Sequence, residues 1–200
     1  MKVTHLASAL AAAAFGLGSF TALADVAPPQ DVPYQGTLKI NVDATDVAHR
    51  IFRVHEVIPA AAGPLTLLYP QWLPGNHSPT GTIDKMAGLV VKANGQVLPW
   101  TRDPLNVFAF HVDVPQGASG VEVAFQFLSA QEKSQGRVVM TPEMLNMQWN
   151  SVTLYPAGHY ARQINTEASV KLPAGWQAGT ALEVASKDGD TLNFKPINYD

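Results

Sequence analysis

The sequence predicts an all-β fold, either an antiparallel β-sandwich or a saddle-like pair of sheets, preceded by a cleavable signal peptide. Apolar and polar residues alternate with a period of two in several short segments, as in half-buried strands. Turn-forming residues recur about every 8–12 residues, which is typical of sandwiches and barrels. Asn94-Gly95, between two apolar segments, is a strong hairpin signal. No segment carries a long apolar stripe of helical period.

Residues 1–24 have the features of a secretory signal peptide. Met1-Lys2 begins the chain, residues 6–23 are apolar and uncharged, and Ala22-Leu23-Ala24 matches a small-x-small cleavage pattern. We therefore expect the mature chain to begin at Asp25 and to be periplasmic or secreted. A retained membrane anchor is the alternative, because the apolar stretch has about the 18 residues that a transmembrane helix needs.

The chain after the signal peptide is predicted to be one β domain with a short leader. Proline-rich residues 25–33 form an extended lead-in, and the domain covers residues 34–200. The first strands are predicted at residues 34–42, 49–58 and 65–69, from alternation or from a short apolar run. The third of these follows a Gly-Pro break.

The later strands are predicted to pair as hairpins. Three pairs of segments are separated by turn residues: 89–93 and 96–100, 107–114 and 121–127, and 182–185 and 192–194. Their turns are Asn94-Gly95, Pro115-Gln116-Gly117 and Lys187-Asp188-Gly189-Asp190. An antiparallel arrangement follows, because strands joined by short turns run in opposite directions.

The composition excludes several classes of function. Lys and Arg number 13 against 16 Asp and Glu, so the net charge is −3 and no basic excess is present to bind phosphates. Nucleic acid is therefore not an expected partner. The chain has no Cys, which excludes disulfides, cysteine-ligated metal sites and a thiol nucleophile. Nothing after the signal peptide is long and apolar enough to span a bilayer.

A partial zinc motif is present but incomplete. His55-Glu56-Val57-Ile58-Pro59 begins like H-E-x-x-H and has Pro59 where the second His would stand. The segment has strand periodicity, which places His55 and Glu56 on opposite faces, and we interpret them as a solvent-facing or edge pair. The six His residues of the chain do not predict a metal site. We predict no catalytic and no metal-binding residue in this chain.

Two aromatic segments, residues 69–81 and 147–160, are the candidate functional regions. The first has three Pro, two Gly, a Tyr, a Trp and a His in 13 residues, and proline excludes a strand interior. Such a loop is either a rigid crossover in which Trp72 plugs the end of the sandwich, or part of a binding or docking surface. The candidate domain-docking or cleft-wall residues are Trp72, Pro74, Gly75, His77, Trp149, Asn150, Tyr155 and Tyr160.

The same segments resemble the N-terminal domain of M61 peptidases, the glycyl aminopeptidase family. Residues 69–77 (YPQWLPGNH) match the signature P-x-W-x-P-G-x-[HY] of that family. The resemblance covers roughly residues 34–200. Further matching elements follow in order: Ala87-Gly88-Leu89, Ala93-Asn94-Gly95, Trp100-Thr101-Arg102-Asp103, Trp149-Asn150, residues 154–158 and residues 172–176.

The resemblance implies a secreted or periplasmic zinc aminopeptidase in which this domain is non-catalytic. It would pack on a downstream catalytic domain that carries H-E-x-x-H and the zinc, and it would help to wall the substrate cleft. No catalytic residue of the family has a matching position before the chain reaches Tyr199-Asp200. We therefore expect a fragment or truncated product that is inactive alone and has no cofactor of its own. Its expected partners are the catalytic domain and, through it, a peptide substrate.

Two alternatives come from other classes of function. A self-standing periplasmic ligand-binding β-sandwich would use Trp72, Trp100 or Trp149 as a stacking platform for sugar or peptide. An enzyme that uses scattered carboxylates is the other alternative, because the spacing of carboxylates in space is not visible in a sequence.

Overall fold

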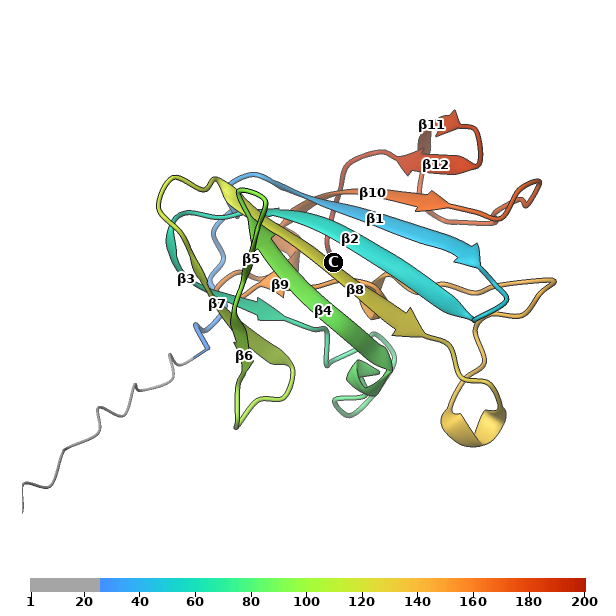
Figure 1. Ribbon diagram of the computed structural model, residues 1–200, viewed down its shortest axis with the longest axis horizontal. Coiled ribbons are helices and arrows are strands. Elements are labelled where there is room, and N and C mark those ends of the chain that lie inside the picture. Colours follow the sequence, from blue (N-terminus) through green and yellow to red (C-terminus); the bar gives the residue numbers. More distant parts are fainter. Residues whose placement is uncertain (1–25) are drawn as a thin grey trace, which may run out of the picture.

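Residues 26–200, which a computed structural model describes, form two open β-sheets connected by loops and short 3-10 turns (Figure 1). This part of the chain contains no α-helix, which confirms the predicted all-β class. The 3-10 turns are Ile83–Lys85, Lys133–Gln135, Trp149–Ser151 and Ala161–Gln163. None of these turns is long enough to cross a membrane. The predicted signal peptide, residues 1–24, lies outside the described residues.

The larger sheet has the strand order β11-β12-β10-β1-β2-β8-β4-β5, and β13 also pairs with β10. Its strands are β1 (Thr37–Asp46), β2 (Ile51–Pro59), β4 (Met86–Ala93), β5 (Gln96–Leu98), β8 (Gly120–Leu128), β10 (Asn165–Lys171), β11 (Val184–Asp188), β12 (Thr191–Phe194) and β13 (Ile197–Asn198). The antiparallel ladder between β2 and β8 runs from Ile51↔Leu128 to Pro59↔Gly120 and lies at the centre of this sheet.

The smaller sheet has the strand order β6-β7-β3-β9. Its strands are β3 (Gly63–Leu68), β6 (Trp100–Arg102), β7 (Ala109–Val114) and β9 (Tyr155–Pro156). Leu67 and Phe110 of this sheet belong to the same buried cluster as Ile40, Val54 and Val123 of the larger sheet. The two sheets therefore share one hydrophobic core.

Two predicted turns are confirmed. Asn94 and Gly95 both have positive φ, 50° and 76°, and they connect β4 to β5 with Ala93 opposite Gln96. Two successive positive φ values are the signature of the turn that Asn-Gly favours. The second turn lies at Gly189, between the paired strands β11 and β12.

The single strand predicted at residues 96–100 is two strands. β5 ends at Leu98 and belongs to the larger sheet, whereas β6 begins at Trp100 and belongs to the smaller sheet. Pro99 lies between them and has no N–H to donate to a ladder. The chain changes sheet at this proline.

The predicted pairing of residues 107–114 with 121–127 is wrong. β7 pairs with β3 and β6, and β8 pairs with β2 and β4, so the turn between them connects the two sheets. An added Cβ at Gly120 would lie 2.5 Å from the carbonyl oxygen of Ile58 in β2. Glycine permits this close approach, which brings β8 against β2 from its first residue.

One pair of strands departs from the predicted antiparallel arrangement. β10 runs parallel to β1, in a register from Thr37↔Asn165 to Asp43↔Lys171. Parallel neighbours need a long connection, and residues 47–164 separate β1 from β10; the last part of this connection, residues 129–164, follows β8. This long excursion carries the second aromatic segment.

Candidate functional site

Residues 69–81 fold back on themselves as a narrow loop that projects Trp72. The N–H of Gly81 donates to the carbonyl of Gln71 at 3.0 Å, and Trp72 forms an isolated antiparallel bridge with Pro79. These contacts close the loop without a regular strand. The side chain of Trp72 is 62% exposed, so it does not plug the end of the core.

Tyr69 anchors the base of this loop to the second aromatic segment. Its side chain is 1% exposed, and its hydroxyl donates to the carbonyl of Ser151 at 2.9 Å. Burial raises the pKa of Tyr69 to about 12, which keeps the hydroxyl protonated as a donor. Because Ser151 ends the 3-10 turn Trp149–Ser151, the two aromatic segments support each other.

Aromatic pairs connect the second segment to the C-terminal strands. The ring of Trp149 meets the ring of Phe194 in β12 edge-on, with centroids 5.8 Å apart. The ring of Tyr155 lies 5.1 Å from that of Tyr199, centroid to centroid. Such pairs add to the stabilisation that comes from buried area alone.

A cavity of about 590 Å³ lies between the two aromatic segments and the C-terminal strands. Five of the predicted docking residues line it together: Trp72, Pro74, Trp149, Asn150 and Tyr155. Apolar residues from other elements, such as Ile40 of β1 and Ile197 of β13, complete the lining. The structure thus combines two segments that are about 70 residues apart in the sequence.

The other three predicted docking residues lie outside this lining. Gly75 and His77 are exposed near the tip of the loop, and the φ of +81° at Gly75 is in the region that favours glycine. The ring of Tyr160 packs against the guanidinium of Arg162, whose carbon lies 4.5 Å from the ring centroid.

Trp100, a residue of the alternative stacking platform, lies elsewhere. Its indole N–H donates to the carbonyl of Leu89 at 3.1 Å. Its ring packs edge-on against Phe110, 5.5 Å between centroids. Trp100 is therefore a partly buried residue at the edge of the core, and Trp72 and Trp149 are the tryptophans of the cavity.

Glu56 was interpreted from sequence as part of a solvent-facing or edge pair, and this is wrong. The residue is fully buried in β2, an interior strand of the larger sheet. Both its carboxyl oxygens accept from the N–H of Leu154, at 2.9 and 3.1 Å. The alternation of the strand could have predicted this burial. Side chains of a strand alternate between two faces, and Glu56 lies on the same, inward face as Phe52, Val54 and Ile58.

Burial raises the pKa of Glu56 to about 8, although the Thr153 hydroxyl and the N–H of Leu154 partly oppose this rise. A nearby phenol has a related environment. The Tyr199 hydroxyl is buried and has no hydrogen-bond partner within residues 26–200. Burial, followed by the charge of Glu56, raises the pKa of Tyr199 well above its usual value. Glu56 is therefore buried behind the lining of the cavity, next to Tyr199, which is part of that lining.

A separate hydrogen-bonded row crosses the smaller sheet. Thr66 Oγ1 lies 3.0 Å from His111 Nδ1, and His111 Nε2 lies 2.9 Å from Asp103 Oδ2. The other oxygen of Asp103 accepts from the N–H groups of Leu105 and Asn106, each at 2.8 Å. His111 first, and then these N–H groups, lower the pKa of Asp103. The row fixes the loop that follows β6.

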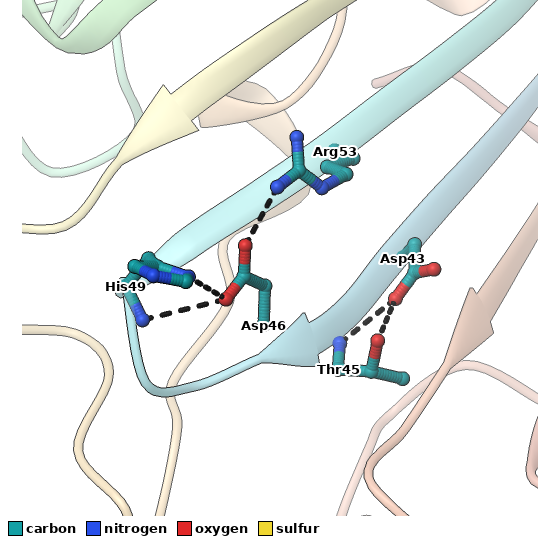
Figure 2. Close-up of polar contacts among 5 residues, drawn as sticks. All are labelled: Asp43, Thr45, Asp46, His49 and Arg53. Atoms are coloured by element: carbon teal, nitrogen blue, oxygen red, sulfur yellow. Dashed lines mark hydrogen bonds and ion pairs between the residues drawn. The ribbon is translucent and has the colours of Figure 1, made fainter.

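The turn between β1 and β2 carries an exposed polar cluster, which Figure 2 shows. Asp46 accepts from Arg53 Nη2 at 2.6 Å and lies 2.7 Å from His49 Nδ1. Asp43 accepts from the N–H and the hydroxyl of Thr45, at 2.9 and 2.6 Å. His49, more than Arg53, lowers the pKa of Asp46. These contacts close the turn.

The described residues do not fit a zinc ion. Within residues 26–200, no group of three or more His, Cys, Asp or Glu side chains converges on one point. His55 and Glu56 lie on opposite faces of β2, as predicted: His55 is exposed and 3.5 Å from Glu122, whereas Glu56 is buried. Zinc chemistry would need residues other than these.

Comparison with known families gives one match over most of the chain. A family model described as the peptidase M61 N-terminal domain matches residues 39–200. No curated protein sequence matches the chain.

Solved structures resemble the chain at low sequence identity. An aminopeptidase N family protein from Idiomarina loihiensis has a TM-score of 0.65 and 17% identity, over 82% of this chain and 27% of that protein. An M1 zinc metallopeptidase from Deinococcus radiodurans has a TM-score of 0.48 and 10% identity, over 86% of this chain and 40% of that one. This chain therefore spans less than half the length of either protein. The first likeness shows a shared fold.

Proposed function

Because the matching model covers residues 39–200, the chain belongs to the peptidase M61 N-terminal domain family, and we propose that it is the non-catalytic β domain of a secreted zinc aminopeptidase. In this role the domain packs on the catalytic domain of the same polypeptide. The aromatic cavity faces that domain, and Trp72 and Trp149 help to form one wall of its substrate cleft.

The exposure of Trp72 is the observation that carries this proposal. A tryptophan side chain offers up to about 250 Å² of surface, and large aromatic residues are enriched at protein interfaces. Here the side chain is 62% exposed, although Gly81 and Pro79 hold its loop in one conformation. A rigid loop that presents an exposed tryptophan at the rim of a cavity is suited to insertion into a partner.

The experiment measures binding between this chain and the catalytic domain of the peptidase that contains it. We expect association, and we expect Trp72→Ala to weaken it at least tenfold while the fold is retained. Leu105→Ala is the matched control, because Leu105 is 97% exposed and lies in the loop after β6. Equal effects of the two substitutions, or no association, would contradict the proposal.

Ligand binding by the chain alone is a second candidate function, and the size of the cavity supports it. A volume of about 590 Å³ lies within the range of about 300–1,000 Å³ that small-molecule pockets occupy. Titration of the chain with aromatic peptides and with oligosaccharides, followed by indole fluorescence, tests this candidate. Saturable binding that Trp149→Ala removes would favour it over domain docking.

Export to the periplasm or the medium is part of the main proposal. Its support is the pattern of residues 1–24, with an uncharged apolar stretch and a small-x-small site. N-terminal sequencing of the expressed protein in the extracytoplasmic fraction should begin at Asp25. Recovery of the uncleaved chain in the cytoplasm or the membrane would refute it.

A further inference from the structure

The buried carboxyl of Glu56 connects the larger sheet to the wall of the cavity. Glu56 lies between Ile40 of β1 and Val123 of β8 on the core side of the sheet. Its oxygens accept from the N–H of Leu154, in the segment that leads to β9 of the smaller sheet. The next residue, Tyr155, lines the cavity. One carboxyl therefore connects β2 of the larger sheet to the segment that carries Tyr155 into the lining of the cavity.

The groups that face Glu56 are uncharged. The hydroxyl of Thr153 donates to the carbonyl of Leu154 at 3.3 Å and lowers the pKa of Glu56, and Tyr199 lies close enough for the charge of Glu56 to affect its phenol. Tyr155 and Tyr69 face Tyr199 in turn. No charged side chain within residues 26–200 offsets the burial of Glu56. Each of these groups belongs to the wall or to the base of the Trp72 loop.

We propose that Glu56 is a positioning residue for the docking cavity: its neutral carboxyl holds residues 149–155 and Tyr199 as an ordered wall, and its ionisation releases that wall. This inference rests on the proposed function, because the wall matters as the surface on which the catalytic domain docks. Glu56 touches no substrate in this role. It acts through Leu154, Thr153 and Tyr155.

The physical reason is the difference in hydration between two states of the wall. In the closed state the carboxyl is dry, and the neutral acid is preferred, with a pKa of about 8. In an open state water reaches Glu56, and its pKa returns toward the ordinary value of 4.5. Between these two values the ratio of closed to open molecules falls about tenfold for each unit of pH.

The test follows the wall by NMR in the isotope-labelled chain from pH 5 to 9.5. The amides of Leu154 and Tyr155 should titrate together with the carboxyl carbon of Glu56, with one midpoint that lies above pH 4.5 and below pH 8. In Glu56→Gln, which keeps a neutral acceptor, the amides should stay at their low-pH positions. His55→Gln alters the opposite face of the same strand and should keep the wild-type midpoint.

Three results would overturn the inference. One is a carboxyl midpoint for Glu56 near pH 4.5 in the wild-type chain, a measurement that needs no variant to fold. Another is a titration of the Leu154 amide in Glu56→Gln that equals the wild-type titration. The third is Glu56→Leu with the same amide positions as the wild type, because then packing alone would hold the wall.

A measurement of binding to the catalytic domain distinguishes a failure of this inference from a failure of the proposed function. The affinity of the wild-type chain for the catalytic domain should fall by up to about tenfold from pH 7 to pH 9, and that of Glu56→Gln should not. A wall that titrates while the affinity of the wild-type chain stays constant would refute docking at this cavity and leave the role of Glu56 in the wall intact. A wall that does not titrate refutes the inference, whatever the affinity does.

Discussion

Gly81 lies where the Trp72 loop closes, and its replacement by alanine should open the loop. A Cβ at this position would stand 2.0 Å from the carbonyl oxygen of Pro70 and 2.9 Å from Cα of Gln71. Real Cβ contacts below 3.0 Å essentially do not occur, so the two backbone segments must separate by about 1 Å. Backbone atoms cannot rotate away as a flexible side chain can. The hydrogen bond from Gly81 to Gln71 is then lost or lengthened.

The expected cost of Gly81→Ala is about 2–4 kcal/mol of unfolding free energy. Steric overpacking contributes about 1–3 kcal/mol, and the hydrogen bond contributes about 1 kcal/mol. Urea denaturation of both proteins measures the sum. Hydrogen exchange of the amides near Trp72 then shows whether the effect is local.

Gly179→Ala is the matched control. A Cβ at Gly179 meets no atom within 4 Å, and its φ is not in the left-handed region. The same chemical change there should stay within about 0.5 kcal/mol of the wild type. If Gly81→Ala destabilises the protein no more than Gly179→Ala does, the close approach does not hold the loop, and the account of a rigid Trp72 loop fails.

Three further substitutions test the buried polar groups. The pKa of Glu56 is raised to about 8, so its contribution to stability is present below about pH 4.5 and is lost as the pH rises to 8. Urea denaturation at pH 5, 7 and 9 should therefore show a fall of up to about 5 kcal/mol in the wild type that is absent in Glu56→Gln. The pKa of Asp103 is lowered, so its contribution is present above its unfolded pKa and is lost as the pH falls through the folded value. In His111→Ala, the unfolding free energy should fall less between neutral and acid pH than in the wild type. An equal fall in both proteins would contradict the stabilising contact between His111 and Asp103. Tyr69→Phe removes the donor to the Ser151 carbonyl and should cost about 1–3 kcal/mol in thermal or urea denaturation; no loss would show that water replaces the phenol.

Local patterns were sufficient for most of the strands and for two of the turns, although they predicted no strand where β9, β10 and β13 lie. Alternation in β1, β2 and β8 places every second side chain in the core. Asn94-Gly95 predicts its hairpin because the two residues tolerate the positive φ that the turn needs. These are properties of neighbouring residues, and a sequence displays them directly.

The choice of partner strand was not predictable in the same way. Short turns suggested that β7 pairs with β8, whereas the structure assigns the two strands to different sheets. The parallel pair of β1 and β10 joins segments more than 100 residues apart. Such pairings depend on which apolar faces must meet in one core, and this is a property of the whole chain.

The sequence by itself determined the all-β class, the likeness to the M61 N-terminal domain and the two aromatic segments. The tertiary structure decided that Trp72 and Trp149 line one cavity and that Glu56 is buried behind its wall. The reason is the range of the forces involved. Hydrophobic periodicity and turn preference act over a few residues, whereas burial of a carboxyl and formation of a cavity depend on strands that come from distant parts of the chain.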